Sequence, residues 1–130
     1  MSKEEGRQVK QALLVEDHVL FREGLALLLS WRTDLDCVEA GSLAEGHQVL
    51  SDPKGTADIA IISVDLPDGD GCELIERLHK TKPDVPVLAL ATDRSRTRQA
   101  RALEMGADEV LSKATPVEQI IASVERIRHR

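Results

Sequence analysis

The sequence predicts an α/β protein in which five parallel strands form one doubly wound sheet with helices on both faces. Short apolar runs, typical of strands buried on both faces, alternate five times with amphipathic helical patterns. The length of 130 residues suits a single domain, and 42% hydrophobic residues are enough to fill its core. Phe and Trp occur once each and Tyr is absent, so this core must be aliphatic.

The amino half of the chain supplies two strands and two helices. A polar leader at residues 1–10 precedes the first apolar run, ALLV, at residues 12–15. Apolar side chains at spacings of three and four then predict a helix over residues 20–29. The second strand is expected at residues 37–40. Ser42 then caps the next helix, because a Glu follows three residues later as in a capping box.

The carboxyl half supplies the other three strands and helices. Apolar runs predict strands at residues 57–63, 85–91 and 108–112. An Arg-rich helix follows the fourth strand and ends at Gly106. Thr115 is expected to cap the last helix, with Pro116 at its first position. The apolar stripe of that helix consists of Val117, Ile120, Ile121, Val124 and Ile127.

Composition excludes several classes of function. The formal charge of −6 argues against nonspecific nucleic-acid binding by the domain, and so few aromatic residues offer no stacking platform for single strands. We find no apolar run long enough to span a bilayer and no secretory leader, so we expect a cytoplasmic protein without membrane contact. Cys37 and Cys72 are then expected to be reduced thiols.

Chemically active side chains stand where four of the predicted strands end. They are Glu16 and Asp17, Ser63 and Asp65, Thr92 and Asp93, and Ser112 and Lys113. The carboxyl ends of the strands of a doubly wound sheet line one edge, where ligands bind. Carboxylates suit a hard cation such as Mg²⁺, while a lysine and a hydroxyl suit phosphate oxygens. The sequence therefore predicts a site for a cation and an oxyanion at this edge.

Over nearly all of residues 11–128, the chain resembles a response-regulator receiver domain of bacterial two-component signalling. The matching segments are LLVEDHVLFREGL, DLPDGDG, VPVLALAT and GADEVLSK. The wording DHxLFREGL is most similar to the NarL/FixJ (LuxR-type) branch, whose members carry a DNA-binding helix-turn-helix after the receiver. The resemblance implies a receiver domain over residues 11–130, with the flavodoxin-like (βα)5 architecture and strand order 2-1-3-4-5.

The resemblance also implies a role for each residue of this edge. In the family the phosphate acceptor is an aspartate four residues before the loop proline. That proline is Pro67 here, so the acceptor position is Ser63. Glu16 and Asp17 match the acidic pair, with Asp17 as the expected direct Mg²⁺ ligand. Asp65 falls where the family offers a backbone carbonyl to the metal.

Two further matches complete the implied pocket. Thr92 matches the hydroxyl residue that contacts the phosphoryl group, and Lys113 matches the lysine of the family. Lys113 keeps acidic neighbours, and we expect it to pair with Asp17. With one carboxylate missing, we expect no required cofactor and at most a weak Mg²⁺ site formed by Asp17 with Glu16 and Asp65.

Three positions depart from the pattern of a working receiver. Ser63 replaces the acceptor, and a hydroxyl needs a general base and yields a stable phosphoester rather than an acyl phosphate. Val110 stands where the family has a Tyr or Phe ring that changes rotamer on phosphorylation. Asp93, the fourth acid of the pocket, would repel an incoming phosphoryl group.

These departures indicate an atypical receiver, not an enzyme, that acts in signal transduction and transcription regulation without aspartate phosphorylation. It would bind a protein partner or a second copy through the helix 4/strand 5/helix 5 faces or the helix 1/helix 5 faces. DNA would be bound only through a C-terminal helix-turn-helix domain outside this chain. Two alternatives stay open. One is a receiver phosphorylated on Asp65 or through a rearranged loop, and the other is a small metal-dependent phosphoryl-handling enzyme.

Two smaller features each have two interpretations. Four arginines cluster on and before the fourth helix: Arg94, Arg96, Arg98 and Arg101. The spacings of Arg94, Arg98 and Arg101 place these three on one face, and the cluster forms either a solvated face or a docking surface. Cys72, at the start of the third helix, is either a buried structural thiol or a thiol made reactive by the helix N-terminus.

Overall fold

The computed structural model describes residues 10–55, 57–92 and 96–129, which form three layers with a sheet in the middle. The strands of this sheet are β1 (Lys10–Val15), β2 (Leu35–Ala40), β3 (Ile59–Ser63), β6 (Val87–Ala91) and β7 (Glu109–Ser112). All neighbouring strands run parallel, in the order β2-β1-β3-β6-β7. Counted along the chain, this is the predicted order 2-1-3-4-5, so the fold class is confirmed.

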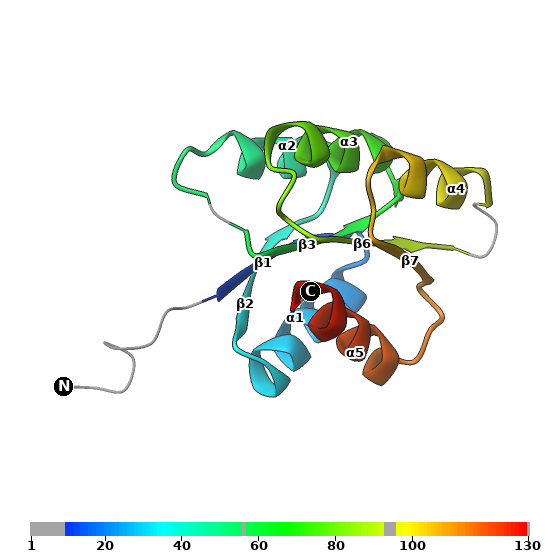
Figure 1. Ribbon diagram of the computed structural model, residues 1–130. Helices are drawn as coiled ribbons and strands as arrows, with labels where there is room; N and C mark the ends of the chain where they lie inside the picture. Colours follow the sequence, from blue (N-terminus) through cyan, green and yellow to red (C-terminus); the bar gives the residue numbers. More distant parts are fainter. Residues whose placement is uncertain (1–9, 56, 93–95, 130) are drawn as a thin grey trace.

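Helices cover both faces of the sheet (Figure 1). One face carries α1 (Val19–Arg32) and α5 (Val117–Arg128), and the other carries α2 (Leu43–Ser51), α3 (Cys72–Thr81) and α4 (Arg96–Met105). None of the helices within the described residues is both long and apolar enough to cross a membrane.

The core consists of two aliphatic clusters, one on each face of the sheet. Successive strand side chains point to opposite faces, so β1 contributes to both clusters. Leu13 and Val15 pack in the cluster under α2 and α3. Ala12 and Leu14 pack in the other cluster, with the buried residues of α1 and α5. The predicted pattern of strands buried on both faces is therefore confirmed.

The helix starts differ from the sequence predictions at two places. Ser42 caps α2 as expected, because its side chain accepts a hydrogen bond from Glu45 N at 3.1 Å. The prediction that Thr115 caps α5 is wrong. That helix begins at Val117, with Pro116 at its cap position and no capping side chain. The cap of α1 was not predicted: Nδ1 of His18 accepts from Phe21 N at 3.3 Å.

A short hairpin lies between β3 and α3 and was not predicted as strand. Its strands β4 (Asp65–Leu66) and β5 (Gly69–Asp70) pair antiparallel. Gly71 closes the connection to α3, because a Cβ at this position would lie 2.0 Å from the Ser63 carbonyl oxygen. Only a residue without a side chain allows this approach. The glycines of DLPDGDG thus turn the chain tightly at the end of β3.

Candidate functional site

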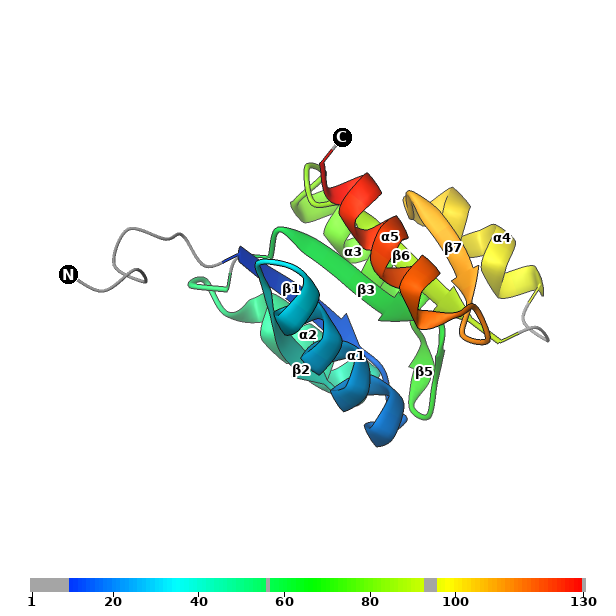
Figure 2. The same ribbon diagram turned by 90° about the horizontal axis from the view of Figure 1, so that it is seen from below.

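The predicted strand-end residues lie at one edge of the sheet. The carboxyl ends of β1, β3, β6 and β7 point toward the same edge (Figure 2). The backbone ladder continues one residue past two of them, since Glu16 N donates to Ala40 O and Lys113 N donates to Ala91 O, both at 2.9 Å. The backbone of Glu16 and of Lys113 is therefore fixed by hydrogen bonds of the sheet, which also fixes where their side chains start.

The centre of the site is a buried carboxylate, Glu16, whose side chain is 0% exposed. It accepts hydrogen bonds from the hydroxyl of Ser63, from Nζ of Lys113 at 2.8 Å and from His18 N at 2.7 Å. Burial raises the pKa of Glu16, but the hydrogen bonds and the charge of Lys113 outweigh it, so this pKa lies below its ordinary value. We call Glu16, Ser63 and Lys113 the Glu16 cluster.

The expected pairing of Lys113 with Asp17 is wrong, because the ammonium group pairs with Glu16 instead. Asp17 is exposed. The ring of Phe21 in α1 also faces Lys113, with Nζ 5.1 Å from the ring centroid. The cation thus contacts both a buried carboxylate and an aromatic face.

The alternation of strand side chains explains why Glu16 and not Asp17 turns inward. Counting by two from Ala12 and Leu14 leads to Glu16, and counting from Ile59 and Ile61 leads to Ser63. These strand residues all belong to the cluster under α1 and α5. Asp17 follows Leu13 and Val15, which face the other side. The alternation of side chains along β1 thus indicates from the sequence that Glu16 faces inward.

The acceptor position is a buried neutral hydroxyl. Ser63 is 1% exposed and donates its proton to Glu16. A serine nucleophile needs a base that takes this proton. Glu16 is a poor base, because Lys113 and the other donors lower its pKa. Ser63 is thus buried, and its hydroxyl is bound to a carboxylate.

Asp65 lies apart from the Glu16 cluster and contacts a different set of residues. Its Oδ1 accepts from Arg98 Nη1 at 2.9 Å, while its Oδ2 accepts from the amide and the hydroxyl of Thr92, each at 3.2 Å. Asp65 is thus bound to β6 and α4. Thr92, expected to contact a phosphoryl group, donates to this carboxylate instead.

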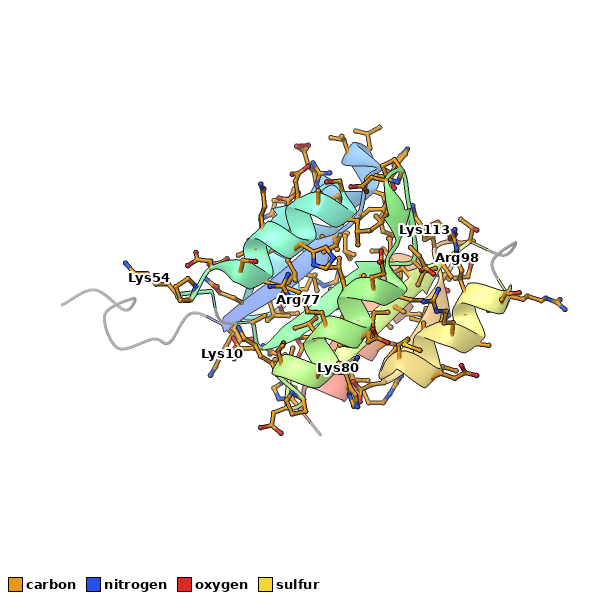
Figure 3. All side chains as sticks on the ribbon, turned by 90° about the horizontal axis from the view of Figure 1, so that it is seen from above. Lys10, Lys54, Arg77, Lys80, Arg98 and Lys113 are labelled. Carbon is orange, nitrogen blue, oxygen red and sulfur yellow. The ribbon has the colours of Figure 1, made fainter. Side chains whose placement is uncertain are left out.

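Arg101 binds the same hairpin one turn further along α4. Its Nη1 lies 2.7 Å from Oδ2 of Asp70, which belongs to β5. Figure 3 labels Arg98 and Lys113 at this edge, close to the hairpin. We call Asp65–Arg98 and Asp70–Arg101 the hairpin–α4 pairs. Part of the Arg-rich face is therefore occupied within the molecule, while Asp93 and Arg94 lie outside the described residues.

The three acids named as possible magnesium ligands have different surroundings in the structure. Glu16 is bound by a lysine and Asp65 by an arginine, while Asp17 points into solvent. Across residues 10–55, 57–92 and 96–129, no three His, Cys, Asp or Glu side chains are arranged to hold a metal ion. The weak Mg²⁺ site expected at Asp17 with Glu16 and Asp65 stays a prediction.

Two remaining predictions concern apolar surroundings. Val110 is partly buried in β7 and packs against the cluster under α2, α3 and α4, so an aliphatic side chain fills the switch position. Cys72 is buried, and burial together with Asp70 raises its pKa to about 12. Burial likewise raises the pKa of Cys37 to about 12. Cys72 is therefore a structural thiol, not one activated by its helix.

Sequence comparisons point to one family. Residues 12–125 match the family described as response regulator receiver domain. The chain is 38% identical over 104 residues to the DNA-binding transcriptional activator DevR/DosR of Mycobacterium tuberculosis. It is 29% identical over 117 residues to the methanol utilization control regulatory protein MoxX of Paracoccus denitrificans. These matches cover 79% and 90% of this chain but 47% and 52% of the relatives, so it spans about half their length.

Solved structures agree with this match. The non-phosphorylated HemR receiver domain from Leptospira biflexa is 27% identical with a TM-score of 0.82, and the match covers 93% of this chain and 95% of that one. A CheY-like receiver domain protein from Methanospirillum hungatei has a TM-score of 0.85 at 20% identity, covering 94% and 95% of the two chains. The second likeness supports the fold alone.

Proposed function

Because this chain belongs to the response regulator receiver domain family, we propose that it is an atypical receiver whose signalling does not depend on phosphorylation of an aspartate. The observation that carries this proposal is the Glu16 cluster. The acceptor position at the end of β3 holds a hydroxyl, and the lysine beside it is already neutralised by a buried carboxylate. The Glu16 carboxylate is thus the anion that pairs with Lys113 in this pocket.

A phosphoryl group at this position would meet unfavourable electrostatics. Lys113 is the cation that would stabilise it, but Glu16 holds that cation at 2.8 Å. A dianionic phosphoryl group next to the buried Glu16 would place like charges together. Its entry would require Glu16 to be protonated or displaced, and the lowered pKa of Glu16 opposes protonation.

The alternatives have less support. Phosphorylation of Asp65 would require the loop to break its bonds to Arg98 and Thr92. It would also require a shift of roughly 6–7 Å to reach the acceptor position, since two residues of extended chain separate the sites. A metal-dependent enzyme needs a group of converging ligands, and none is found within the part of the chain that the structure describes.

We infer that the domain transmits its signal through protein contacts in a cytoplasmic regulator of transcription. The relatives' names support this role, since they include a transcriptional activator and a control regulatory protein. The DHxLFREGL segment favours the NarL/FixJ branch, although a phosphate regulon regulatory protein, PhoB of Pseudomonas aeruginosa, is also 28% identical. DNA contact would come from a helix-turn-helix domain outside these residues.

Phosphoryl transfer from acetyl phosphate with Mg²⁺ tests the proposal, with intact mass as the readout. We expect no gain of a phosphoryl group under conditions that label a receiver with an aspartate acceptor. An acid-labile adduct that disappears in Asp65→Asn would contradict the proposal in favour of Asp65. An acid-stable adduct lost in Ser63→Ala would contradict the expected absence of labelling and would identify a phosphoserine. We expect at most weak Mg²⁺ binding, visible as little or no thermal stabilisation by added Mg²⁺.

A further inference from the structure

A cavity opens at the amino edge of the sheet, at the opposite end of the strands from the Glu16 cluster. Its volume is about 470 Å³, and small-molecule sites typically measure about 300–1,000 Å³. Figure 3 labels Lys54, one of its lining residues, at the other end of the molecule from Lys113. The apolar side chains that line it come from β1, β2, α2 and α3 and are Leu13, Val38, Val49, Leu50 and Leu78. We call this the amino-edge cavity.

The lengths of α2 and β2 explain why the cavity forms. β2 has six residues and is about 20 Å long, whereas α2 has nine residues and is about 14 Å long. α2 follows the carboxyl end of β2 and runs back over the sheet, so it ends before it covers the amino ends of the strands. Val38 pairs in register with the buried Leu13, yet Val38 is 36% exposed. The helix is thus too short for the strand beneath it.

Hydrogen bonds hold the walls of the cavity in place. Arg77 of α3 donates from Nη1 to His47 O at 3.1 Å and from Nη2 to the Ser51 hydroxyl at 3.0 Å, both in α2. Lys82, just after α3, donates from Nζ to Gly55 O at 2.9 Å, in the loop that follows α2. These bonds tie α3 to α2 and to its loop. A preformed cavity of this kind binds a ligand without the cost of ordering its walls.

Two lysines of the lining form no ion pair with a carboxylate of the described residues. Lys82 uses one of its three ammonium protons on Gly55 O. Lys54 is exposed, and its side chain forms no hydrogen bond or ion pair within residues 10–55, 57–92 and 96–129. Asp52 is the only acid of the lining, and its Oδ1 accepts from the backbone amide of Lys54 at 2.9 Å. The cavity therefore has a positive balance in a chain with a formal charge of −6.

We propose that the amino-edge cavity binds a small carboxylate with an aliphatic body. The aliphatic body lies against Leu13, Val38 and Leu78, and its removal from water contributes most of the affinity. The carboxylate lies at the mouth of the cavity, where Lys54 and Lys82 pair with it by charge-assisted hydrogen bonds. The apolar lining thus provides affinity, while the two lysines select an anion.

This site goes beyond the proposed function and rests on it only for its role in signalling, since a receiver that does not depend on phosphorylation needs another input. Binding itself requires no residue of the Glu16 cluster. A phosphoryl-labelling result and a ligand-binding result can therefore fail independently, and each failure identifies which proposal is wrong.

Titration of the full chain with sodium octanoate, followed by two-dimensional amide NMR spectra, tests the site. We expect one saturable site with a dissociation constant on the order of 1 mM, because so small a molecule has few contacting atoms. The amides of Val38, Leu50 and Gly55 should shift, and those of Ser63 and Thr92 should stay in place. Absence of shifts up to about 10 mM octanoate would overturn the proposal. Shifts centred on Ser63 and Thr92 instead would overturn it as well.

Octylammonium chloride, with the same chain length and the opposite charge, tests the selection of an anion. We expect it to bind at least about tenfold more weakly than octanoate, because two lysines repel it. Lys54→Gln should narrow this difference, since it removes one of the two cations at the mouth. Equal affinity for octanoate and octylammonium in the original chain would contradict a carboxylate site.

A matched set of glutamine variants makes the test specific to the cavity. Gln48 lies in the exposed part of the lining, on α2. Gln48→Glu should raise the dissociation constant of octanoate at least about threefold by repulsion, and Gln48→Lys should lower it. Gln119→Glu makes the same change at an exposed position of α5 and should have no effect. These residues are all good helix formers, so the fold is retained. An equal loss of affinity in Gln48→Glu and Gln119→Glu would contradict binding at the amino-edge cavity.

Discussion

Two groups of ion pairs at the carboxyl edge of the sheet consist of the same kinds of charged group and differ in how deeply they are buried. In the Glu16 cluster the carboxylate is 0% exposed and the Lys113 side chain 23%. In the hairpin–α4 pairs the arginines are 44% and 49% exposed. A buried ion pair is costly to break because the remaining charge is left without water, whereas an exposed pair contributes little. The first group therefore fixes the state of the pocket, and the second can be rearranged.

This contrast bears on how the domain signals. In a working receiver the phosphoryl group would be the variable charge of the pocket. Here Lys113 of the pocket is already paired with the buried Glu16. Any conformational change is then expected at the hairpin and α4, where breaking an ion pair costs about 1 kcal/mol or less, rather than in the pocket itself.

The largest effect is expected from Lys113→Met. The variant leaves the Glu16 carboxylate buried with only Ser63 and the His18 amide as donors, so its pKa should rise. Removing one partner of a buried pair costs about 3–5 kcal/mol in the free energy of unfolding. Urea unfolding at pH 7 measures this loss.

Two comparisons sharpen that measurement. Arg101→Met removes the cation of an exposed pair and should cost no more than about 1 kcal/mol. The double variant Glu16→Gln/Lys113→Met removes both charges of the buried pair and should recover most of the loss. Equal costs for Lys113→Met and Arg101→Met would show that burial does not separate the two groups.

The second prediction concerns Ser63→Asp, which restores the acceptor type of the family. The new carboxylate would lie beside Glu16, and two carboxylates sharing one site force one of them to bind a proton. We expect a loss of about 1–3 kcal/mol at pH 7 and no labelling by acetyl phosphate. We expect that restoring the acceptor alone is not enough, because Glu16 still pairs with Lys113.

The combination Ser63→Asp/Glu16→Asp separates this explanation from a general loss of the pocket. Shortening the side chain at position 16 by one methylene withdraws its carboxylate from Lys113, which can then pair with the new acceptor. We expect labelling by acetyl phosphate to appear in the double variant only. Labelling of Ser63→Asp alone would show that Glu16 does not block the site.

The fold could be predicted almost completely, and the site only in part. Apolar runs and helical spacings depend on the local sequence, so they identified every strand of the main sheet. The strand-end rule correctly brought Glu16, Ser63 and Lys113 together. The partner of Lys113 depends on which of two adjacent acids turns inward, and that depends on the register at the end of β1. The family pattern drew attention to Asp17, while the alternation along β1 pointed to Glu16.

The hairpin–α4 pairs could not be predicted from the sequence. Asp65 and Arg98 are 33 residues apart, and their contact depends on how the hairpin bends toward α4. The glycines of the loop indicated a turn but not its direction. Helical spacing showed that Arg98 and Arg101 share a face, and only the three-dimensional structure shows that this face meets Asp65 and Asp70.

The third prediction uses the pH dependence of stability. The pKa of Glu16 is lower in the folded state than its unfolded value of about 4.3. Its contribution to the free energy of unfolding is therefore fully present above that pH. It is lost as the pH falls through the folded pKa. Asp34 and Asp68 also have lowered pKa values, because Arg128 binds the first and the amides of α2 bind the second. Both acids therefore add to the fall of the free energy of unfolding with falling pH.

Glu16→Gln shows how much of the pH dependence of stability comes from the Glu16 cluster. Urea unfolding between pH 7 and pH 3 should show a shallower loss of stability in this variant than in the original chain. Ser63→Ala removes one donor to Glu16 and should fall between the two. An unchanged slope in Glu16→Gln would mean that the acid sensitivity comes from the exposed acids instead.

The smallest effect is expected from Arg98→Gln. Asp65 keeps its two bonds from Thr92, and the arginine side chain is 44% exposed, so the free energy of unfolding should change by no more than about 1 kcal/mol. The difference should shrink in about 1 M salt, where the Debye length falls to about 3 Å. Local opening should respond more, with faster amide exchange in β4 and β5 than in β1. A global loss of several kcal/mol, or unchanged exchange in the hairpin, would contradict the distinction between a fixed pocket and an adjustable hairpin–α4 contact.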